Sequence, residues 1–387
     1  MIHTAPLTTT PPEETPLRPT DSIVGRPLDH VATPFALLDG AALQHNVDHM
    51  AGLLAGLGVA HRPHTKTHKC AEIATMQLAA GARGLTCATM PEARLMSRVT
   101  GREASVLIAR SLAADVNKVD EIARLARETN LSMVIEEIDQ VAPLAAACQA
   151  ADSTLGLLVE LDIGFGRAGL RSTDTATQLA AAIGRHDGLR FDGLMGYEAH
   201  AMRVTDDDER RRTVHAALDR LAAAKETIER RGIGVREVSV GGTITYRSAA
   251  EHPVSTEVRS GGYVFMHATA KPPSSDLAGF RHALSVRSSV IGSYEDGRIV
   301  LDAGLKSVST DGGLHLHVRG LDGAAVVMVT EEHLVLDTTK AARRPRVGER
   351  LDIVSSHSCT TANLHGHYVV TRGTDHVDDV WNVAARY

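Results

Sequence analysis

Short apolar runs alternate with helical stretches from residue 59 to residue 265, and this rhythm limits the possible folds more than any other feature. The intervening segments, such as NKVDEIARLARE, carry apolar residues at helical spacing. Eight strands that alternate with helices predict a closed (β/α)8 barrel. A doubly wound open sheet is the alternative, but the GxGxxG fingerprint expected after its first strand is missing. The predicted strands are VAHRPH (59–64), GLTCAT (84–89), ASVLIA (104–109), LSMVIE (131–136), LGLLVELD (155–162), FDGLMGYE (191–198), VREVSVGG (235–242) and VRSGGYVF (258–265).

The pattern changes after about residue 275, where apolar and polar residues alternate between glycine-containing turns. We therefore expect an α/β protein with a (β/α)8 barrel over residues 31–275 and a smaller C-terminal β-domain over 276–387. A strand from about residues 31–40 joins the β-domain in this prediction. Residues 1–30 are rich in Thr and Pro and poor in large apolar side chains, which predicts a mobile N-terminal arm.

Composition excludes several classes of protein. A formal charge of −6 and a pI near 6.4 show no basic excess, so we expect no nucleic-acid partner. The chain has no apolar run of about 18 residues and no basic-then-apolar N-terminus, so we expect neither a membrane span nor a secretory signal. The four cysteines form no CxxC pair, which fits a reducing cytoplasm better than a disulfide framework.

A dense cationic cluster, HRPHTKTHKC, follows the first predicted barrel strand at residues 61–70. Active-site residues of such barrels lie at the C-terminal ends of the strands. A lysine that is partly desolvated there, among other cations, has a lowered pKa and can form a Schiff base. We choose Lys66, at the strand end, over Lys69, which we expect to have turned into the next helix.

Small residues follow the last two predicted strands, on the far side of the barrel from Lys66. Backbone amides and hydroxyls in such loops can bind an anion, so these residues predict a phosphate cup. A lysine opposite a phosphate cup is the arrangement that holds pyridoxal phosphate at both ends. The predicted cup contains Gly241, Gly242, Thr243, Thr245, Gly261 and Gly262, with Tyr263 directly after them.

A second set of candidate ligands is His357 and Cys359 in the segment SSHSCTTANLHGHYVV. On a strand, His-x-Cys would place both side chains on one face. This nitrogen and sulfur pair favours Zn²⁺, with Mn²⁺ the alternative, and two protein ligands leave open positions for water and substrate. His365 and His367 form a second such pair, which we rank lower.

Several motifs together resemble the D-threonine aldolase and D-serine dehydratase family of fold-type III pyridoxal phosphate enzymes, which are related to alanine racemase. The resemblance runs from about Thr33 to the C-terminus and keeps the order of the motifs. They are RPHTKTHK, DIGFGRAG (162–169), GYEAH, GGT, EVRSGGYVF, DAGLKSVSTDGG (302–313), EEH (331–333) and HSC (357–359).

The resemblance implies a role for several residues. Lys66 would bind the cofactor covalently and remove the α-proton of a D-amino acid. Arg167 would lie near the cofactor phenolate, although a salt bridge to Asp162 is an alternative. Tyr197 and His200 would contact the cofactor or substrate, with His200 stacked on the pyridine ring. A homodimer is also implied, in which the β-domain of one subunit closes the barrel of the other.

Departures from the family pattern favour one reaction. Aldolase members tend to have His-x-Asp, whereas His357-x-Cys359 is the dehydratase pattern, and they tend to have a histidine where this chain has Arg203. The resemblance therefore implies β-elimination from a D-3-hydroxy amino acid, with retro-aldol cleavage as the alternative. A non-catalytic pyridoxal phosphate carrier and a metal hydrolase are less favoured. His267 stands where relatives often have Asp, and we give it no role.

Overall fold

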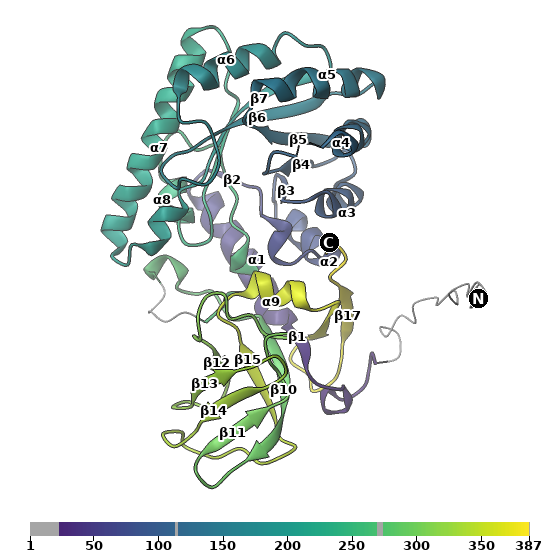
Figure 1. The fold of residues 1–387 in the computed structure, drawn as a ribbon, viewed down its shortest axis with the longest axis vertical. Helices are drawn as coiled ribbons and strands as arrows, with labels where there is room; N and C mark the ends of the chain where they lie inside the picture. Colours follow the sequence, from purple (N-terminus) through teal and green to yellow (C-terminus); the bar gives the residue numbers. More distant parts are fainter. Residues whose placement is uncertain (1–22, 113–114, 269–273, 387) are drawn as a thin grey trace, which may run out of the picture.

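The computed structural model describes residues 23–112, 115–268 and 274–386. These form a parallel barrel and a C-terminal β-rich domain, the upper and lower parts of Figure 1. The predicted barrel is confirmed. Of the expected N-terminal arm, residues 1–22 lie outside the described residues. Leu28, farther along the arm, packs with Val369 and Val377 of the β-domain.

The barrel sheet contains eight parallel strands in the order β2-β9-β8-β7-β6-β5-β4-β3. A single bridge between His64 and Thr86 joins the two ends of this order and closes the barrel. The strands are β2 (Ala60–His61), β3 (Gly84–Cys87), β4 (Ser105–Ile108), β5 (Asn130–Ile135), β6 (Leu155–Leu161), β7 (Leu189–Gly196), β8 (Glu237–Val240) and β9 (Glu257–Val258).

Helices cover the outside of the barrel, and their N-termini follow local sequence signals. The side chains of Thr89, Ser172 and Asp206 each accept a hydrogen bond from a backbone N–H three residues on, as N-cap residues do. The helices are α1 (Gly40–Gly56), α2 (Ala71–Ala79), α3 (Met90–Thr100), α4 (Val116–Glu128), α5 (Val141–Ala150), α6 (Thr173–Ile183), α7 (Asp207–Arg230) and α8 (Tyr246–Ala250).

The last barrel strand is much shorter than the sequence predicts. β9 ends at Val258, and the GGYVF segment forms the 3-10 helix η5 (Gly262–Val264) instead of a strand. The backbone at Gly261 passes so close to the first strand segment that an added Cβ would lie 2.6 Å from the His64 carbonyl oxygen. The glycine loop after β9 therefore lies beside the cationic cluster, because β9 pairs with β2, and the prediction that it lies on the far side of the barrel from Lys66 is wrong.

The β-domain is a nine-stranded sheet to which the N-terminal strand β1 (Phe35–Asp39) belongs. β1 pairs antiparallel with β10 (Leu284–Ser293) and parallel with β16 (His367–Thr371). The remaining strands are β11 (Arg298–Leu301), β12 (His317–Val318), β13 (Ala325–Val329), β14 (Leu334–Asp337), β15 (Arg350–Val354) and β17 (Asp379–Asn382). Within the described residues, no helix is both long and apolar enough to cross a membrane.

Helix α9 (Ser358–Leu364) lies where the β-domain meets the barrel (Figure 1). It faces the 3-10 helix η2 (Thr65–Thr67), the turn that carries Lys66. Three polar contacts join the domains here. Thr67 Oγ1 lies 3.2 Å from Cys359 Sγ, Lys69 Nζ donates to Asn363 Oδ1 at 2.9 Å, and the Tyr368 hydroxyl donates to the His68 carbonyl at 2.8 Å.

Candidate active site

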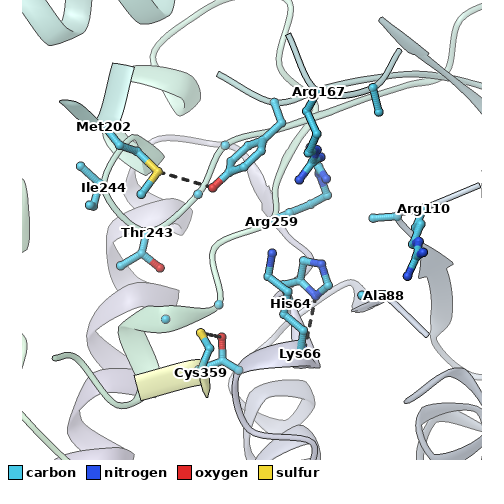
Figure 2. Close-up of a pocket in the computed structure, with 18 of the residues that line it drawn as sticks. His64, Lys66, Ala88, Arg110, Arg167, Met202, Thr243, Ile244, Arg259 and Cys359 are labelled. Carbon is cyan, nitrogen blue, oxygen red and sulfur yellow. Dashed lines mark hydrogen bonds between the residues drawn. The ribbon is translucent and has the colours of Figure 1, made fainter. Parts of the chain in front are cut away.

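A cavity of about 620 Å³ opens at the C-terminal ends of the barrel strands, next to the β-domain. Loops after nearly every barrel strand line it, together with His357 and Cys359 from the start of α9. Figure 2 shows Thr243 and Cys359 on one side of this pocket and Arg110 on the other, with Lys66 between them. The pocket therefore brings the predicted cofactor residues and the predicted metal ligands together.

Lys66 lies in η2, just after the closing bridge of the barrel, and not in the strand itself. Its side chain enters the open cavity, although protein surrounds it on most sides. Loss of solvation lowers the pKa of Lys66, and the charges of Arg259 and Arg167 lower it further, against the opposing effect of Cys359. This is the electrostatic environment expected of a Schiff-base lysine.

Lys69 is not in the following helix, as the sequence suggested, but precedes it in a left-handed conformation with φ of 52°. The side chain of Lys69 is buried against Glu92, 3.6 Å away. It therefore lies outside the pocket lining, and Lys66 is the pocket lysine.

The glycine loops line the pocket, but their donors differ from those predicted. The amides of Gly241 and Gly242 donate to the Glu198 and Thr245 side chains, at 3.3 and 3.1 Å. The backbone N–H groups of Thr243, Ile244 and Gly262, by contrast, have no acceptor within the described chain. These three amides and the Thr243 hydroxyl form the donor set of an anion cup.

Three predicted cofactor contacts lie outside the pocket lining. Thr245 is buried and donates to Glu198 Oε1 at 2.5 Å, so it holds the loop that carries Gly242 without lining the pocket. The Tyr263 hydroxyl accepts from Gln77 at 2.9 Å. His200 lies in the 3-10 helix η4 (Ala199–Arg203), which turns it toward Gly164, where an added Cβ would lie 3.0 Å from the ring.

Arg167 and Tyr197 both line the pocket. The Arg167 guanidinium carbon lies 5.4 Å and 5.6 Å from the ring centroids of Phe165 and Tyr197. Its ion-pair partner is Glu160, at 3.6 Å, whereas Asp162 pairs with Arg171. The alternative in which Arg167 only pairs with Asp162 is therefore wrong.

Arg259 and Glu160 also line the pocket, although no sequence pattern had identified them as site residues. Arg259 is 6% exposed and donates to the Gly196 carbonyl at 2.6 Å, while its Nε has no partner among the described residues. Burial, together with Glu136, raises the pKa of Glu160 to about 7. The position of Arg259 directly before the Ser-Gly-Gly loop was the one signal that could have identified it.

His357 and Cys359 are not on a strand. His357 is the extended residue before α9, and Cys359 lies in the first turn of that helix. Both still line the same pocket. Hydrogen bonding to Cys359 is the main cause that raises the pKa of His357 to about 9. Burial opposes ionisation of Cys359, but His357, Thr67 and Lys66 together outweigh it and lower the pKa of the thiol.

The pair offers one nitrogen and one sulfur donor in the same pocket, which suits a borderline-soft divalent cation. Within the described ranges no group of three or more His, Cys, Asp or Glu side chains is placed to hold a metal. His267 also lines the pocket, and its ring centroid lies 6.0 Å from that of His357. The residues fit a cation with two protein ligands and open positions.

The pocket also fits pyridoxal phosphate. It has a lysine with a lowered pKa. Among the described residues, a set of amides at the carboxyl ends of β8 and β9 and one nitrogen of a buried guanidinium have no hydrogen-bond partner. A closed barrel with such a site and a C-terminal β-domain defines a fold-type III pyridoxal phosphate enzyme.

Comparison with known sequences identifies the family. The family model "Alanine racemase, N-terminal domain" matches residues 38–269, and "Putative serine dehydratase domain" matches residues 283–371. The chain belongs to the alanine racemase N-terminal domain family.

Individual relatives cover nearly the whole chain. A 3-hydroxy-D-aspartate aldolase of Paracoccus denitrificans is 29% identical over 94% of this chain and 95% of its own. The crystal structure of D-threonine aldolase from Filomicrobium marinum matches with a TM-score of 0.89 and 33% identity, over 94% of this chain and 98% of that one. D-threo-3-hydroxyaspartate dehydratase from Delftia sp. HT23 has a TM-score of 0.78 and 27% identity, over 92% and 98%. A cysteine-to-alanine mutant of D-threo-3-hydroxyaspartate dehydratase is known in a metal-free form.

Proposed function

We propose that this chain is a pyridoxal phosphate-dependent lyase that eliminates the hydroxyl group of a D-3-hydroxy amino acid, giving a 2-oxo acid and ammonia. One observation carries this proposal: a single pocket contains both Lys66 and the His357–Cys359 pair. A racemase needs no metal beside its lysine, whereas departure of a β-substituent gains from one. The named relatives, two aldolases and a dehydratase, support the reaction class.

Pyridoxal phosphate, when bound, supplies an electron sink for the electron pair of the bond that breaks at the substrate α-carbon. The chain's own residues do the rest. Lys66 would hold the cofactor and would take the α-proton, because its lowered pKa leaves more of the amine neutral near pH 7. Thr243 and Gly262 would hold the phosphate, and Arg259 and Arg167 would face the ring.

His357 and Cys359 would hold the divalent cation, with Zn²⁺ favoured over Mn²⁺. Such a cation supplies Lewis acidity to an oxygen bound beside it, which eases the departure of a β-hydroxyl as hydroxide. The cysteine, in place of a carboxylate, is the residue that favours elimination in our proposal.

Retro-aldol cleavage to an amino acid and an aldehyde is the second candidate. The higher identity and TM-score of the D-threonine aldolase structure, compared with those of the dehydratase, favour it. In that reaction a base must take the proton of the β-hydroxyl, and the Cα–Cβ bond must break. His200 lies outside the pocket lining, so Glu160 or His267, which line it, would have to serve as that base.

The test is incubation of the protein with D-serine, D-threonine and D-3-hydroxyaspartate, with the L-enantiomers as controls. Ammonia and a 2-oxo acid from the D-substrates would support elimination. Glycine and an aldehyde would establish the aldolase reaction instead. No product from any of the three would overturn the proposal.

A further inference from the structure

His357 can bind a cation well only if one ring nitrogen is fixed and the other is free to face the pocket. In the structure, Nδ1 of His357 lies 2.7 Å from Oδ2 of Asp311. A carboxylate only accepts hydrogen bonds, so Nδ1 keeps its proton. Nε2 is then the nitrogen that releases its proton when a cation binds, and its lone pair becomes the ligand.

Asp311 is itself held in place. Its other oxygen, Oδ1, accepts hydrogen bonds from the hydroxyls of Ser309 at 2.6 Å and Thr360 at 2.9 Å. Thr360 follows Cys359 directly in the first turn of α9. The carboxylate therefore ties the 309–311 loop to the turn that carries both candidate metal ligands.

The loop is also fitted closely to the segment before His357. An added Cβ at Gly312 would lie 2.9 Å from the Ser356 carbonyl oxygen, so the glycine lets the two backbones approach. The Ser309 amide donates to the Thr361 hydroxyl at 3.1 Å. These contacts fix where the Asp311 carboxylate sits relative to the His357 ring.

Stability alone does not account for this pair. The side chains of Asp311 and His357 are 46% and 39% exposed. Ion pairs this exposed contribute little to folding. A carboxylate on the far nitrogen of a metal-binding histidine, however, orients the ring and raises its basicity.

We propose that Asp311 is a positioning residue for His357, which it holds with Nε2 directed to a divalent cation shared with Cys359. This inference rests on the proposed function, because the cation is the ligand proposed there. Asp311 would not touch the cation or the substrate. Its effect would be on the affinity of the His357–Cys359 pair.

The test measures Zn²⁺ affinity by competition with a chromogenic chelator, on the full chain loaded with cofactor. Asp311→Ala should weaken Zn²⁺ binding by about 10–100-fold. Asp311→Asn, whose amide oxygen can still accept from Nδ1, should lose less. Asp296→Ala is the matched control, because Asp296 is an exposed β-domain carboxylate whose ion-pair partner, Arg298, is 4.0 Å away.

The outcomes separate this inference from the proposed function. If the wild type binds Zn²⁺ and Asp311→Ala binds it equally well, the role of Asp311 is refuted and the metal site stands. If the wild type and His357→Ala bind Zn²⁺ equally, the metal site itself is refuted. Unchanged cofactor absorbance and thermal unfolding in Asp311→Asn, with weaker Zn²⁺ binding, would support a positioning role over a structural one.

Discussion

Replacement of each of the two lysines of the cationic cluster should have opposite effects on cofactor absorbance and on protein stability. Lys66 enters the pocket, whereas Lys69 is buried between the barrel and α9. Lys66→Ala should abolish the visible absorbance that covalently attached pyridoxal phosphate shows. Lys69→Met should keep this absorbance but destabilise the protein.

The size of the destabilisation follows from the surroundings of Lys69. Its ammonium lies 3.6 Å from Glu92 Oε1, and the Glu92 side chain is 1% exposed. Without Lys69, Glu92 keeps a hydrogen bond from the Ala88 amide at 2.7 Å but has lost its closest cation. Removing one partner of a buried ion pair costs about 3–5 kcal/mol. The matched variant Lys66→Ala removes a pocket cation and should change stability by less than about 0.5 kcal/mol.

The pH dependence gives an independent check. Burial already raises the pKa of Glu92, against the effects of the Ala88 amide and Lys69. Loss of Lys69 raises this pKa further. When a carboxyl has a higher pKa in the folded than in the unfolded state, the folded protein loses stability as pH rises. The deficit of Lys69→Met should therefore be larger at pH 8 than at pH 5, and Glu92→Gln in the same chain should recover much of it.

Urea denaturation of the cofactor-free variants, and absorbance spectra of the loaded ones, measure the two effects. The reasoning is refuted if Lys69→Met loses the absorbance while Lys66→Ala keeps it. A Lys69→Met variant as stable as the wild type at pH 8 would show that the buried pair contributes nothing.

Four further results are expected. Excess chelator should lower turnover by orders of magnitude, because each 1.36 kcal/mol added to the activation free energy slows the reaction tenfold. The cofactor absorbance should stay unchanged, and full turnover without metal would contradict this expectation. The Cys359→Asp variant should turn over faster with Mn²⁺ than with Zn²⁺, since a carboxylate is the harder ligand, and should regain part of the wild-type turnover. Equal turnover of this variant with the two metals would count against a metal role for Cys359. Because the pKa of Glu160 is raised to about 7, the free energy of unfolding of the cofactor-free protein should fall by at most about 3 kcal/mol as pH rises from 4 to 8. In urea titrations of Glu160→Gln, the free energy of unfolding should depend less on pH. Light scattering should show a dimer at micromolar concentration, whereas a monomer would contradict the proposed closure of each barrel by its partner.

The sequence by itself was sufficient to predict the barrel, because the alternation of strands and helices is a local pattern that each segment expresses on its own. It also identified Lys66, since the cationic cluster follows a strand, and the loops that carry Gly241 and Gly261, since glycine is needed where backbones approach closely. His357 and Cys359 line one pocket, although on a different element than predicted, and their role as metal ligands stays a prediction.

Only the tertiary structure decided which side chains meet. Thr67 and Cys359 are 292 residues apart, and Asp311 and His357 are 46 apart, so no local spacing predicts either contact. His200 follows a barrel strand, as site residues do, but a 3-10 turn places it against Gly164 and outside the pocket lining. A strand pattern fixes which end of the barrel a residue occupies, whereas its side-chain partner depends on how distant segments pack around it.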